Sequence, residues 1–426
     1  MARRRLPRMR RFSLSCVVGA LALWTGASFA QSADPPKTAA PSKTAAPSKT
    51  DQAKKDKKSA PPKKLNCSKG FLSLRTPPPE CAKLRKLEYA LLPAVFSTKE
   101  TSFGGAVYGE LSYFTDKNPK TGVSRTGLGL TYTVRNQFIA RAPVVVTFDE
   151  NNFIIDGTID FRIYPNRYYG LGNDADWDYQ QYREDVLSFN FEFRRRLFGD
   201  IYLGLLWDLR NVFAVKENQA FDTHGDELSK GSAGILVREN PSGSQPYFDQ
   251  GFGVQAVFDS RDSFAYPLSG GYHRLSMRYF NPAFGATHNF TLVTLDARQY
   301  ISLAKNQVLA VQLLAENRNG RPPFSMMSEL GGPTLLRGYF KGRYRDNNSV
   351  LLQTEYRFPI YKRLSGVAFG SVGQVYGPSG AFAFDKFRWT VGGGGRFRFG
   401  AHTYMRIDVG GNHETVALIF NGGQAF

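Results

Sequence analysis

The chain has 426 residues, which is enough for one large barrel or for two ordinary domains. Aromatic residues make up 14% of the chain and glycines number 42, a composition that favours strands and tight turns over helices. The formal net charge of +19 lies mostly near the N-terminus, where residues 1–30 and 31–64 each carry +6, so the charge does not indicate a nucleic-acid partner.

Residues 1–30 have the features of a signal peptide. Six arginines and no acidic residue precede an apolar run over 14–24, and Ser28 and Ala30 supply small residues at the cleavage positions. The mature chain is therefore expected to begin at Gln31. An uncleaved membrane anchor is the competing reading, and the shortness of the apolar run argues against it.

Residues 31–88 are expected to form a periplasmic segment without a globular core. The hexapeptide Thr-Ala-Ala-Pro-Ser-Lys occurs twice in tandem, at 38–43 and 44–49, in a Pro/Lys-rich stretch that predicts a disordered tether. Cys67 and Cys81 follow. In an exported chain, this pair at short spacing predicts one disulfide, with two unpaired or intermolecular thiols as the alternative.

From about residue 89 to the C-terminus, strand-like runs alternate with Gly/Asn/Asp/Pro turns. About sixteen runs can be distinguished, an even number as in closed bacterial barrels. The predicted strands are 89–98, 102–114, 123–135, 137–148, 152–164, 186–196, 199–213, 251–261, 270–281, 288–301, 305–317, 350–361, 364–376, 386–399, 401–411 and 413–422.

The alternation within these runs separates an apolar face from a polar face. In the run 351–358, Leu352 and Tyr356 share one face, while Glu355 and Arg357 share the other. A soluble sandwich also alternates, but many such strands behind a leader peptide favour a barrel with lipid outside and a wet lumen inside. The connections 165–185, 214–250 and 318–349 are too long for hairpin turns and are expected to be extracellular loops or lumenal insertions.

Two neighbouring stretches carry a family resemblance. A Gly-Gly-Pro turn at 331–333 precedes Leu-Arg-Gly-Tyr at 336–339, and a Glu-Tyr-Arg-Phe-Pro strand follows at 355–359. This combination resembles the lumenal-loop signature of the BamA/TamA family of outer-membrane barrels, the bacterial surface antigen family. The segments 258–262 and 165–173 resemble other parts of the same family, so the resemblance covers most of 89–426.

The resemblance implies that Arg337, Gly338 and Tyr339 form a loop inside the barrel. A buried guanidinium needs an acidic partner, and Glu355 on the lumen-facing side of the next strand is the first candidate. The family places an aspartate on the following strand where this chain has Ser371, so anchoring is expected to be weaker or to rest on Glu355 or Asp408. The alternative is a surface loop with a solvated arginine.

The two ends of the chain also bear on the family comparison. Phe426 shares strand parity with Val416, Leu418 and Phe420, and a terminal aromatic at this parity resembles the recognition signal of outer-membrane proteins. Residues 31–88 lack the βααββ alternation of polypeptide-transport-associated modules. The resemblance is therefore to a member without these modules, which implies either a periplasmic partner that recruits the substrate or a divergent role.

No motif predicts catalysis, a cofactor or a metal. The aspartates at 174, 176 and 178 have calcium-loop spacing, but Tyr179 stands where such a loop needs glycine. The glycine run 392–395 has no Walker lysine, so close strand packing in the barrel wall explains it better. No nucleophile motif accompanies the histidines, which are scattered without metal-ligand spacing: His224, His273, His288, His402 and His413.

The sequence thus predicts an all-β chain, with a signal peptide at 1–30, a tether at 31–88 and a transmembrane antiparallel β-barrel at 89–426. The resemblance implies a non-enzymatic role in outer-membrane protein insertion or polypeptide translocation, with outer-membrane lipid and a polypeptide substrate as partners. A passive pore for small solutes is the main alternative, and a lipid-modifying enzyme that uses His288 and a strand serine is a third.

Overall fold

The computed structural model describes residues 87–98, 100–116, 118, 121–175, 177–221, 234–263, 266–398, 404–422 and 424–426. The predicted signal peptide, nearly all of the tether and the Cys67–Cys81 pair lie outside these residues. Within the described part of the chain, none of the helices has the length and apolar character needed to cross a membrane.

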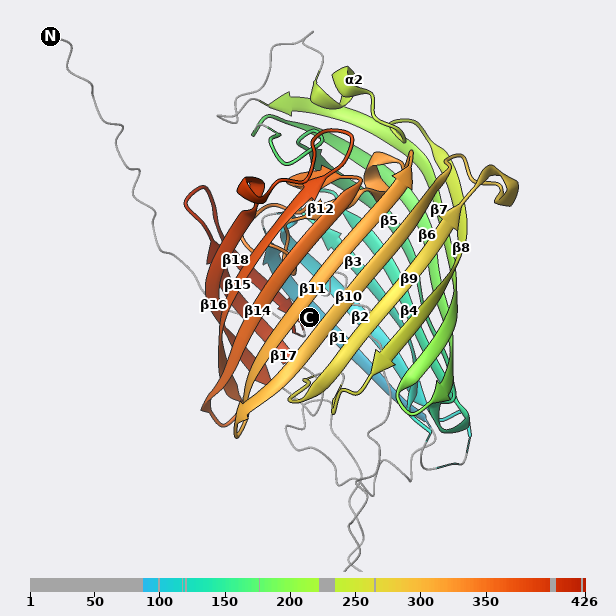
Figure 1. Cartoon of the computed structure of the whole chain (residues 1–426), viewed down its shortest axis with the longest axis vertical. Helices are drawn as coiled ribbons and strands as arrows, with labels where there is room; N and C mark the ends of the chain where they lie inside the picture. The colour runs from blue at the N-terminus through green and yellow to red at the C-terminus, as the bar shows by residue number, and fades with distance from the viewer. Residues whose placement is uncertain are drawn as a thin grey trace, which may run out of the picture.

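Sixteen strands form one antiparallel sheet that curls into a barrel (Figure 1). Each strand pairs with its neighbours along the chain, except that β11 pairs with β14, because β12 and β13 form a separate hairpin. The strands are β1 (Leu87–Thr98), β2 (Ser102–Tyr113), β3 (Ser124–Thr133), β4 (Phe138–Phe148), β5 (Phe153–Tyr168), β6 (Tyr179–Phe198), β7 (Ile201–Phe221), β8 (Tyr247–Asp259), β9 (Gly270–Phe280), β10 (Phe290–Ala304), β11 (Gln307–Gly320), β12 (Ser328–Leu330), β13 (Tyr344–Asp346), β14 (Asn348–Tyr361), β15 (Leu364–Tyr376), β16 (Arg388–Arg398), β17 (Tyr404–Gly411) and β18 (Val416–Gly422).

The sixteen predicted strands correspond one to one with the sixteen strands of the barrel, so the predicted fold class is confirmed. The predicted connections 165–185 and 214–250 were too long, because β5, β6 and β7 continue into them. In the extensions of β5 and β6, Tyr168 and Tyr182 pack around Phe324. The connection 318–349 holds the β12–β13 hairpin, and the short helix α2 (Ile235–Glu239) lies between β7 and β8.

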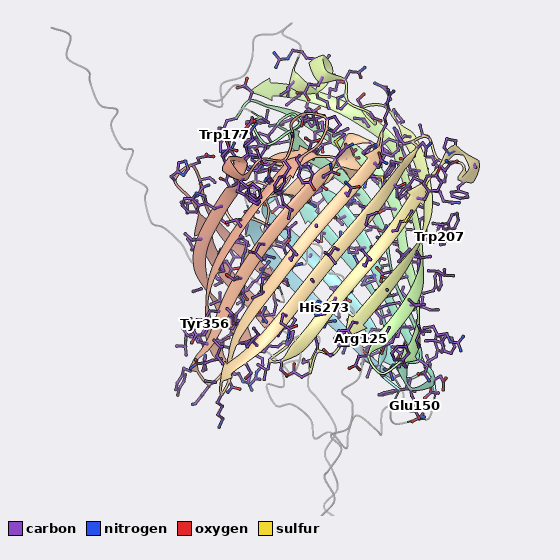
Figure 2. The ribbon with its side chains drawn as sticks, viewed as in Figure 1. Arg125, Glu150, Trp177, Trp207, His273 and Tyr356 are labelled. Atoms are coloured by element: carbon purple, nitrogen blue, oxygen red, sulfur yellow. The ribbon has the colours of Figure 1, made fainter. Side chains whose placement is uncertain are left out.

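The barrel wall is apolar outside and polar inside. On β14, Leu352 is 44% exposed on the outer surface, whereas Glu355 and Arg357 are fully buried. Trp207 projects from the outer side of the barrel wall (Figure 2). Its ring stacks with that of Phe191. An apolar outer surface around a charged interior is the pattern of a membrane-spanning barrel, because lipid solvates the first and water the second.

The two ends of the sheet meet at a seam between β1 and β18. These strands lie beside each other, but within the described residues no ladder of hydrogen bonds joins them. Every other neighbouring pair of strands in the barrel is hydrogen-bonded. The barrel is therefore nearly closed, and the seam is the weakest line in its wall.

The connections differ between the two ends of the barrel. One end has short turns, such as those between β10 and β11 and between β14 and β15. The other end carries α2, the β12–β13 hairpin and the long connections of β5–β6, β7–β8 and β15–β16 (Figure 1). Below, these are called the short-turn end and the long-loop end.

Candidate functional site

The segment 321–347, here called the arginine loop, enters the barrel from the long-loop end. Its β12–β13 hairpin lies against β14 and β15. The buried side chains of Leu330, Leu336, Tyr339 and Tyr344 pack against Leu351 and Val375 of the barrel wall. This apolar contact fixes the base of the loop, so that the residue after Leu336 points at the wall in a defined direction.

That residue, Arg337, is fully buried inside the barrel. Its Nη1 donates to Glu355 Oε2 at 2.8 Å and to Asp408 Oδ2 at 3.0 Å. Its guanidinium carbon lies 3.4 Å from the centre of the Phe369 ring, within the range of a cation–π contact. The structure thus brings together Arg337, Glu355 and Asp408, which the sequence singled out, and adds Phe369, which it did not.

Three more arginines converge on the same two carboxylates. Arg357 Nε donates to Glu355 Oε1 at 2.8 Å, and Arg406 Nη1 donates to Asp408 Oδ2 at 3.4 Å. Arg396 bonds to both acids, to Glu355 Oε2 at 3.2 Å and to Asp408. Four buried guanidinium groups therefore face two buried carboxylates, which leaves a surplus of positive charge in a region of low dielectric. These six residues are called the arginine cluster below.

Neutral acceptors also form hydrogen bonds with the guanidinium groups of the arginine cluster. Arg406 Nη2 donates to the Pro333 carbonyl oxygen at 2.7 Å, which ties the cluster to the Gly-Gly-Pro turn of the arginine loop. Lumen-facing positions on β16 and β17 place Arg396 and Arg406 opposite each other in the ladder. Neither arginine was singled out in the sequence analysis. The alternation of arginine and phenylalanine at 396–399 could have indicated the first, and Asp408, two residues away, could have indicated the second.

Ser371 does not take the place of the aspartate expected on β15. It is buried, and its hydroxyl shares a 2.7 Å hydrogen bond with Thr390 Oγ1, its partner in the β15–β16 ladder. Asp408 on β17 supplies the second carboxylate to Arg337 instead. The arginine loop is thus held by carboxylates from β14 and β17.

Glycines on β16 and β17 make room for the Phe369 ring and the loop. A Cβ atom on Gly392 would lie 2.5 Å from Phe369 Cζ, and one on Gly410 would lie 2.6 Å from the Arg337 carbonyl oxygen. Gly338 has a φ of 134°, and its Cβ would lie 2.7 Å from Gly411 Cα. The glycine run 392–395, predicted to lie in the barrel wall, is part of β16.

Two substitutions on one strand test this packing. Gly392→Ala is expected to destabilise the barrel by about 1–3 kcal/mol, because the new methyl group overlaps Phe369 and the Val409 backbone. Gly395→Ala is the matched control, since no atom lies within 4 Å of its Cβ position. The measurement is the temperature at which the folded band disappears from a semi-native gel. Equal shifts for the two variants would contradict the packing argument.

Tyr339 ties the arginine loop to the turn beside the seam. Its hydroxyl accepts a hydrogen bond from Asn412 Nδ2, and its ring meets Tyr344 edge-on at 5.1 Å. Thr415 Oγ1 donates to the Gly338 carbonyl oxygen at 3.2 Å. Burial raises the pKa of the Tyr339 hydroxyl above its usual value, so it remains a neutral hydrogen-bonding group. The loop therefore contacts the β17–β18 turn directly.

Phe426 does not continue the β18 strand, contrary to the expected parity with Val416, Leu418 and Phe420. The strand ends at Gly422, and Phe426 turns into the barrel, where it is 7% exposed. It leaves the strand because Arg357 Nη2 donates to its carbonyl oxygen at 3.0 Å, and because its ring packs with Tyr300 and Val308.

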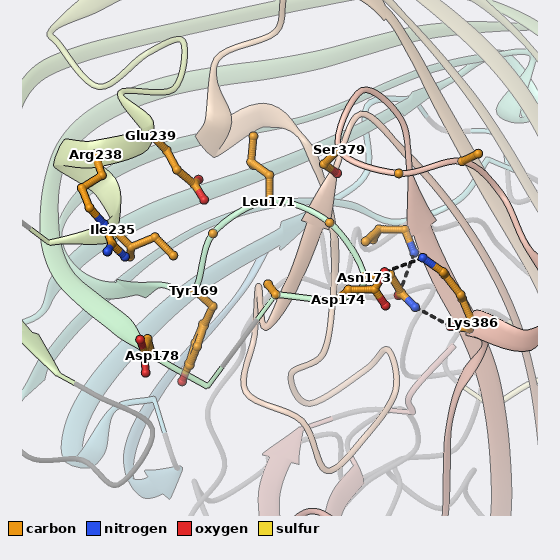
Figure 3. Close-up of a pocket in the computed structure, with 16 residues that line it drawn as sticks. Tyr169, Leu171, Asn173, Asp174, Asp178, Ile235, Arg238, Glu239, Ser379 and Lys386 are labelled. Atoms are coloured by element: carbon orange, nitrogen blue, oxygen red, sulfur yellow. Dashed lines mark hydrogen bonds and ion pairs between the residues drawn. The ribbon is translucent and has the colours of Figure 1, made fainter.

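Asp174 and His288, two of the other sequence candidates, lie at the long-loop end. A cavity of about 260 Å³ is lined by the β5–β6 connection, α2 and the β15–β16 connection, and Asp174 there is paired with Lys386 Nζ at 2.5 Å (Figure 3). His288 Nδ1 bonds to Asp249 Oδ2 at 2.8 Å, while the nearby Ser325 hydroxyl bonds to Tyr247. In the part of the chain that the structure describes, no group of three or more potential metal ligands gathers.

Comparison with known proteins decides the family. Residues 97–425 match the Omp85 superfamily domain. The chain belongs to the Omp85 superfamily. No curated protein matches the sequence of this Omp85 chain. The family resemblance drawn from the arginine loop is confirmed.

Two solved structures show the same fold. One is BamA from Haemophilus ducreyi lacking POTRA domains 1–3, with a TM-score of 0.52 and 12% identity over 79% of this chain and 70% of that chain. The other is CdiB from Escherichia coli, with a TM-score of 0.50 and 14% identity over 79% of this chain and 60% of that chain. The Omp85 chain is thus similar in fold to both, and it spans less than two thirds of the CdiB chain.

Proposed function

We propose that this Omp85 chain resides in the bacterial outer membrane and inserts other polypeptides into that membrane or moves them across it. The observation that carries the proposal is the seam between β1 and β18. Strand edges with unpaired N–H and C=O groups are templates for a further strand, so a polypeptide can add to them by backbone pairing. The membership of the Omp85 superfamily supports the same role.

The position of the arginine loop also supports it. A passive pore needs a continuous wet path, whereas here the loop fills part of the lumen and is held there by the arginine cluster. Tyr339 and Thr415 join the loop to the turn beside β18. A change at the seam can therefore reach the loop through direct contacts.

The proposal includes the parts of the chain that precede the barrel. The predicted signal peptide at 1–30 exports the chain, and the segment 31–88 lies in the periplasm. Because this segment lacks the pattern of polypeptide-transport-associated modules, a periplasmic partner delivers the substrate. No covalent catalysis is part of this mechanism.

An insertion assay tests the proposal. Liposomes with and without the Omp85 chain receive a urea-unfolded outer-membrane barrel protein, and the folded fraction is followed by heat-modifiability on gels. The chain is expected to raise the rate of folding at least tenfold over empty liposomes. The assay is repeated with a periplasmic extract that supplies partners. Equal folding rates with and without the Omp85 chain in that extract would count against insertion.

A passive pore is the second candidate function, and one observation favours it. A cavity of about 390 Å³ inside the barrel is lined by charged side chains of β4–β7 and β9. Among them are five arginines and four carboxylates: Arg141, Arg162, Arg210, Arg274, Arg278, Asp156, Asp160, Glu192 and Asp208. Such a wall suits the passage of small ions.

Conductance in planar bilayers separates the two functions. The wild-type barrel is expected to be nearly closed, because the arginine loop obstructs the path beside this cavity. Arg337→Gln is expected to raise the mean conductance several-fold, since the variant loses both ionic anchors of the loop. Arg183→Gln, which breaks an ion pair with Asp185 and none with the arginine cluster, is the control. A large, steady wild-type conductance would favour the pore.

A further inference from the structure

The connection between β15 and β16 folds back over the outer surface of the barrel. Gln374 stands at an outward position of β15, because Gly373 and Val375 on either side of it face the interior. Gln374 is nevertheless fully buried. It is covered by Ala383 of the connection, whose N–H donates to Gln374 Oε1 at 3.3 Å and whose carbonyl oxygen accepts from Gln374 Nε2 at 3.0 Å. The connection is therefore held against the outside of the wall.

The folded-back segment carries three phenylalanines, Phe382, Phe384 and Phe387, which are here called the aromatic turn. Their ring centroids lie 5.2, 5.9 and 6.5 Å apart, and Phe382 meets Tyr376 of β15 at 5.4 Å. Phe382 is exposed, and Phe384 is 85% exposed. A single exposed apolar side chain is ordinary, but a group of contacting rings at the surface marks a place where something binds.

The aromatic turn continues the apolar outer surface of the strands beside it. Val372 of β15 and Trp389 of β16 are register partners, and both are exposed on the outer face of the wall. Val391, the next outward residue of β16, is exposed as well. From Tyr376 to Phe384 the sequence contains no charged residue. The lipid-facing surface of the wall is thus continuous with the turn.

The height of the turn on the wall matches the edge of a bilayer. Leu364 is the first outward apolar side chain of β15 at the short-turn end. From Leu364 to Gln374 the strand rises about 33 Å along its own axis, or about 25 Å along the membrane normal at a tilt of about 40°. The apolar band of a membrane barrel is about 25 Å tall. The turn, which lies beside Gln374, therefore stands at the boundary of the leaflet at the long-loop end.

The basic side chains in and beside the turn point the other way. Lys386 Nζ pairs with Asp174, and Arg388 Nη2 donates to the Asn173 carbonyl oxygen at 2.8 Å, so that both contact the β5–β6 connection (Figure 3). Asp385 is exposed, and a carboxylate is costly in hydrocarbon. The turn can therefore enter the interface of the bilayer but not its centre.

A second aromatic residue at the long-loop end shows a different arrangement. The β9–β10 connection contains the short 3-10 helix Pro282–Phe284. Phe284 packs edge-on against the outward rings of Phe252 and Tyr279, at 5.3 and 6.2 Å, and is 40% exposed. The described ring neighbours of Phe384 both belong to the aromatic turn itself. Phe384 thus reaches away from the wall, whereas Phe284 forms part of it.

We propose that the aromatic turn is a lipid-binding surface whose phenylalanine rings insert among the acyl chains of the leaflet at the long-loop end. Transfer of an exposed phenylalanine ring from water to acyl chains is favourable because it removes apolar surface from water. The inserted turn fixes the depth of β15 and β16 in the bilayer, and β16 is separated from the seam only by β17 and β18. This binding does not depend on the insertion of other polypeptides.

Fluorescence quenching by lipids with brominated acyl chains tests the proposal. The chain is refolded in liposomes as variants with one tryptophan each, and phenylalanine replaces the other tryptophans. The three probes are Phe384→Trp in the turn, the native Trp207 on the wall, and Val237→Trp in α2 as the control outside the bilayer (Figure 1). Brominated lipid is expected to lower the emission at position 384 at least twofold, as it does for Trp207, and to leave that at position 237 unchanged.

Quenching at position 384 no stronger than at position 237 would overturn the proposal, and would leave the turn open to a protein partner instead. If the variants do not fold, a nitroxide on Phe384→Cys gives the answer in a chain that keeps its tryptophans and carries Cys16→Ser, Cys67→Ser and Cys81→Ser. Oxygen, which dissolves in the bilayer, is expected to relax the nitroxide more than a water-soluble nickel complex does, and the reverse order overturns the proposal. Neither measurement involves an insertion substrate, so each outcome is separate from that of the insertion assay.

Discussion

Glu355→Gln is expected to destabilise the barrel more than Arg337→Gln does, although Arg337 is the residue at the centre of the loop. Glu355 accepts from three arginines, and its loss leaves four buried guanidinium groups facing Asp408 alone. Removing one member of a buried ion pair costs about 3–5 kcal/mol when an uncompensated charge remains. Arg337→Gln instead reduces the positive surplus, and both carboxylates keep other arginine partners.

The order of the two effects is the test. The temperature at which the folded band is lost on a semi-native gel is expected to fall most for Glu355→Gln, less for Arg337→Gln, and least for the control Glu316→Gln. Glu316 is a partly exposed acid that pairs with one arginine, Arg318. An Arg337 variant less stable than the Glu355 variant would show that the loop, not the charge balance, dominates the stability of this region.

A disulfide across the seam is expected to abolish the proposed insertion activity. Cysteine pairs are placed on outward positions, with one partner at Leu91 or Val95 of β1 and the other at Val416 or Leu418 of β18. The background carries Cys67→Ser and Cys81→Ser. In the pairs that oxidise, the rate of insertion is expected to fall at least tenfold, because the strand edges can no longer separate, and reductant is expected to restore it.

A second cross-link provides the control. Leu295 and Ala315 are register partners on the outer face of β10 and β11, so a disulfide between cysteines at these positions joins strands that are already hydrogen-bonded. This cross-link is expected to leave the activity unchanged. If both cross-links abolish activity, or if neither does, the claim that insertion requires separation of β1 and β18 is contradicted.

The strands could be predicted from the sequence because their signal is local. Alternation with a period of two is visible in each run, and it also placed Glu355 and Arg357 on the lumen face. The extension of β5 to Tyr168 could not be predicted in this way. It depends on a contact between Tyr168 and Phe324, which lie far apart in the sequence.

The arginine loop was predictable from its motif, but its surroundings were not. Arg337 reaches both Glu355 and Asp408, which the need for an acidic partner suggested. That Phe369 lies beneath it depends on the absence of side chains at Gly392 and Gly410, which are neighbours only across strands. Strand parity failed to predict the position of Phe426. Alternation predicts which face a residue occupies only while the strand continues, and β18 ends at Gly422.

Photo-crosslinking during insertion tests the central role of the seam most directly. A benzophenone amino acid at Leu91 of β1 or at Leu418 of β18 is expected to crosslink to the incoming polypeptide, whereas the same group at Leu275 on the outer face of β9 is not. Crosslinks of equal yield at all three positions, or at Leu275 alone, would contradict entry of the substrate at the seam.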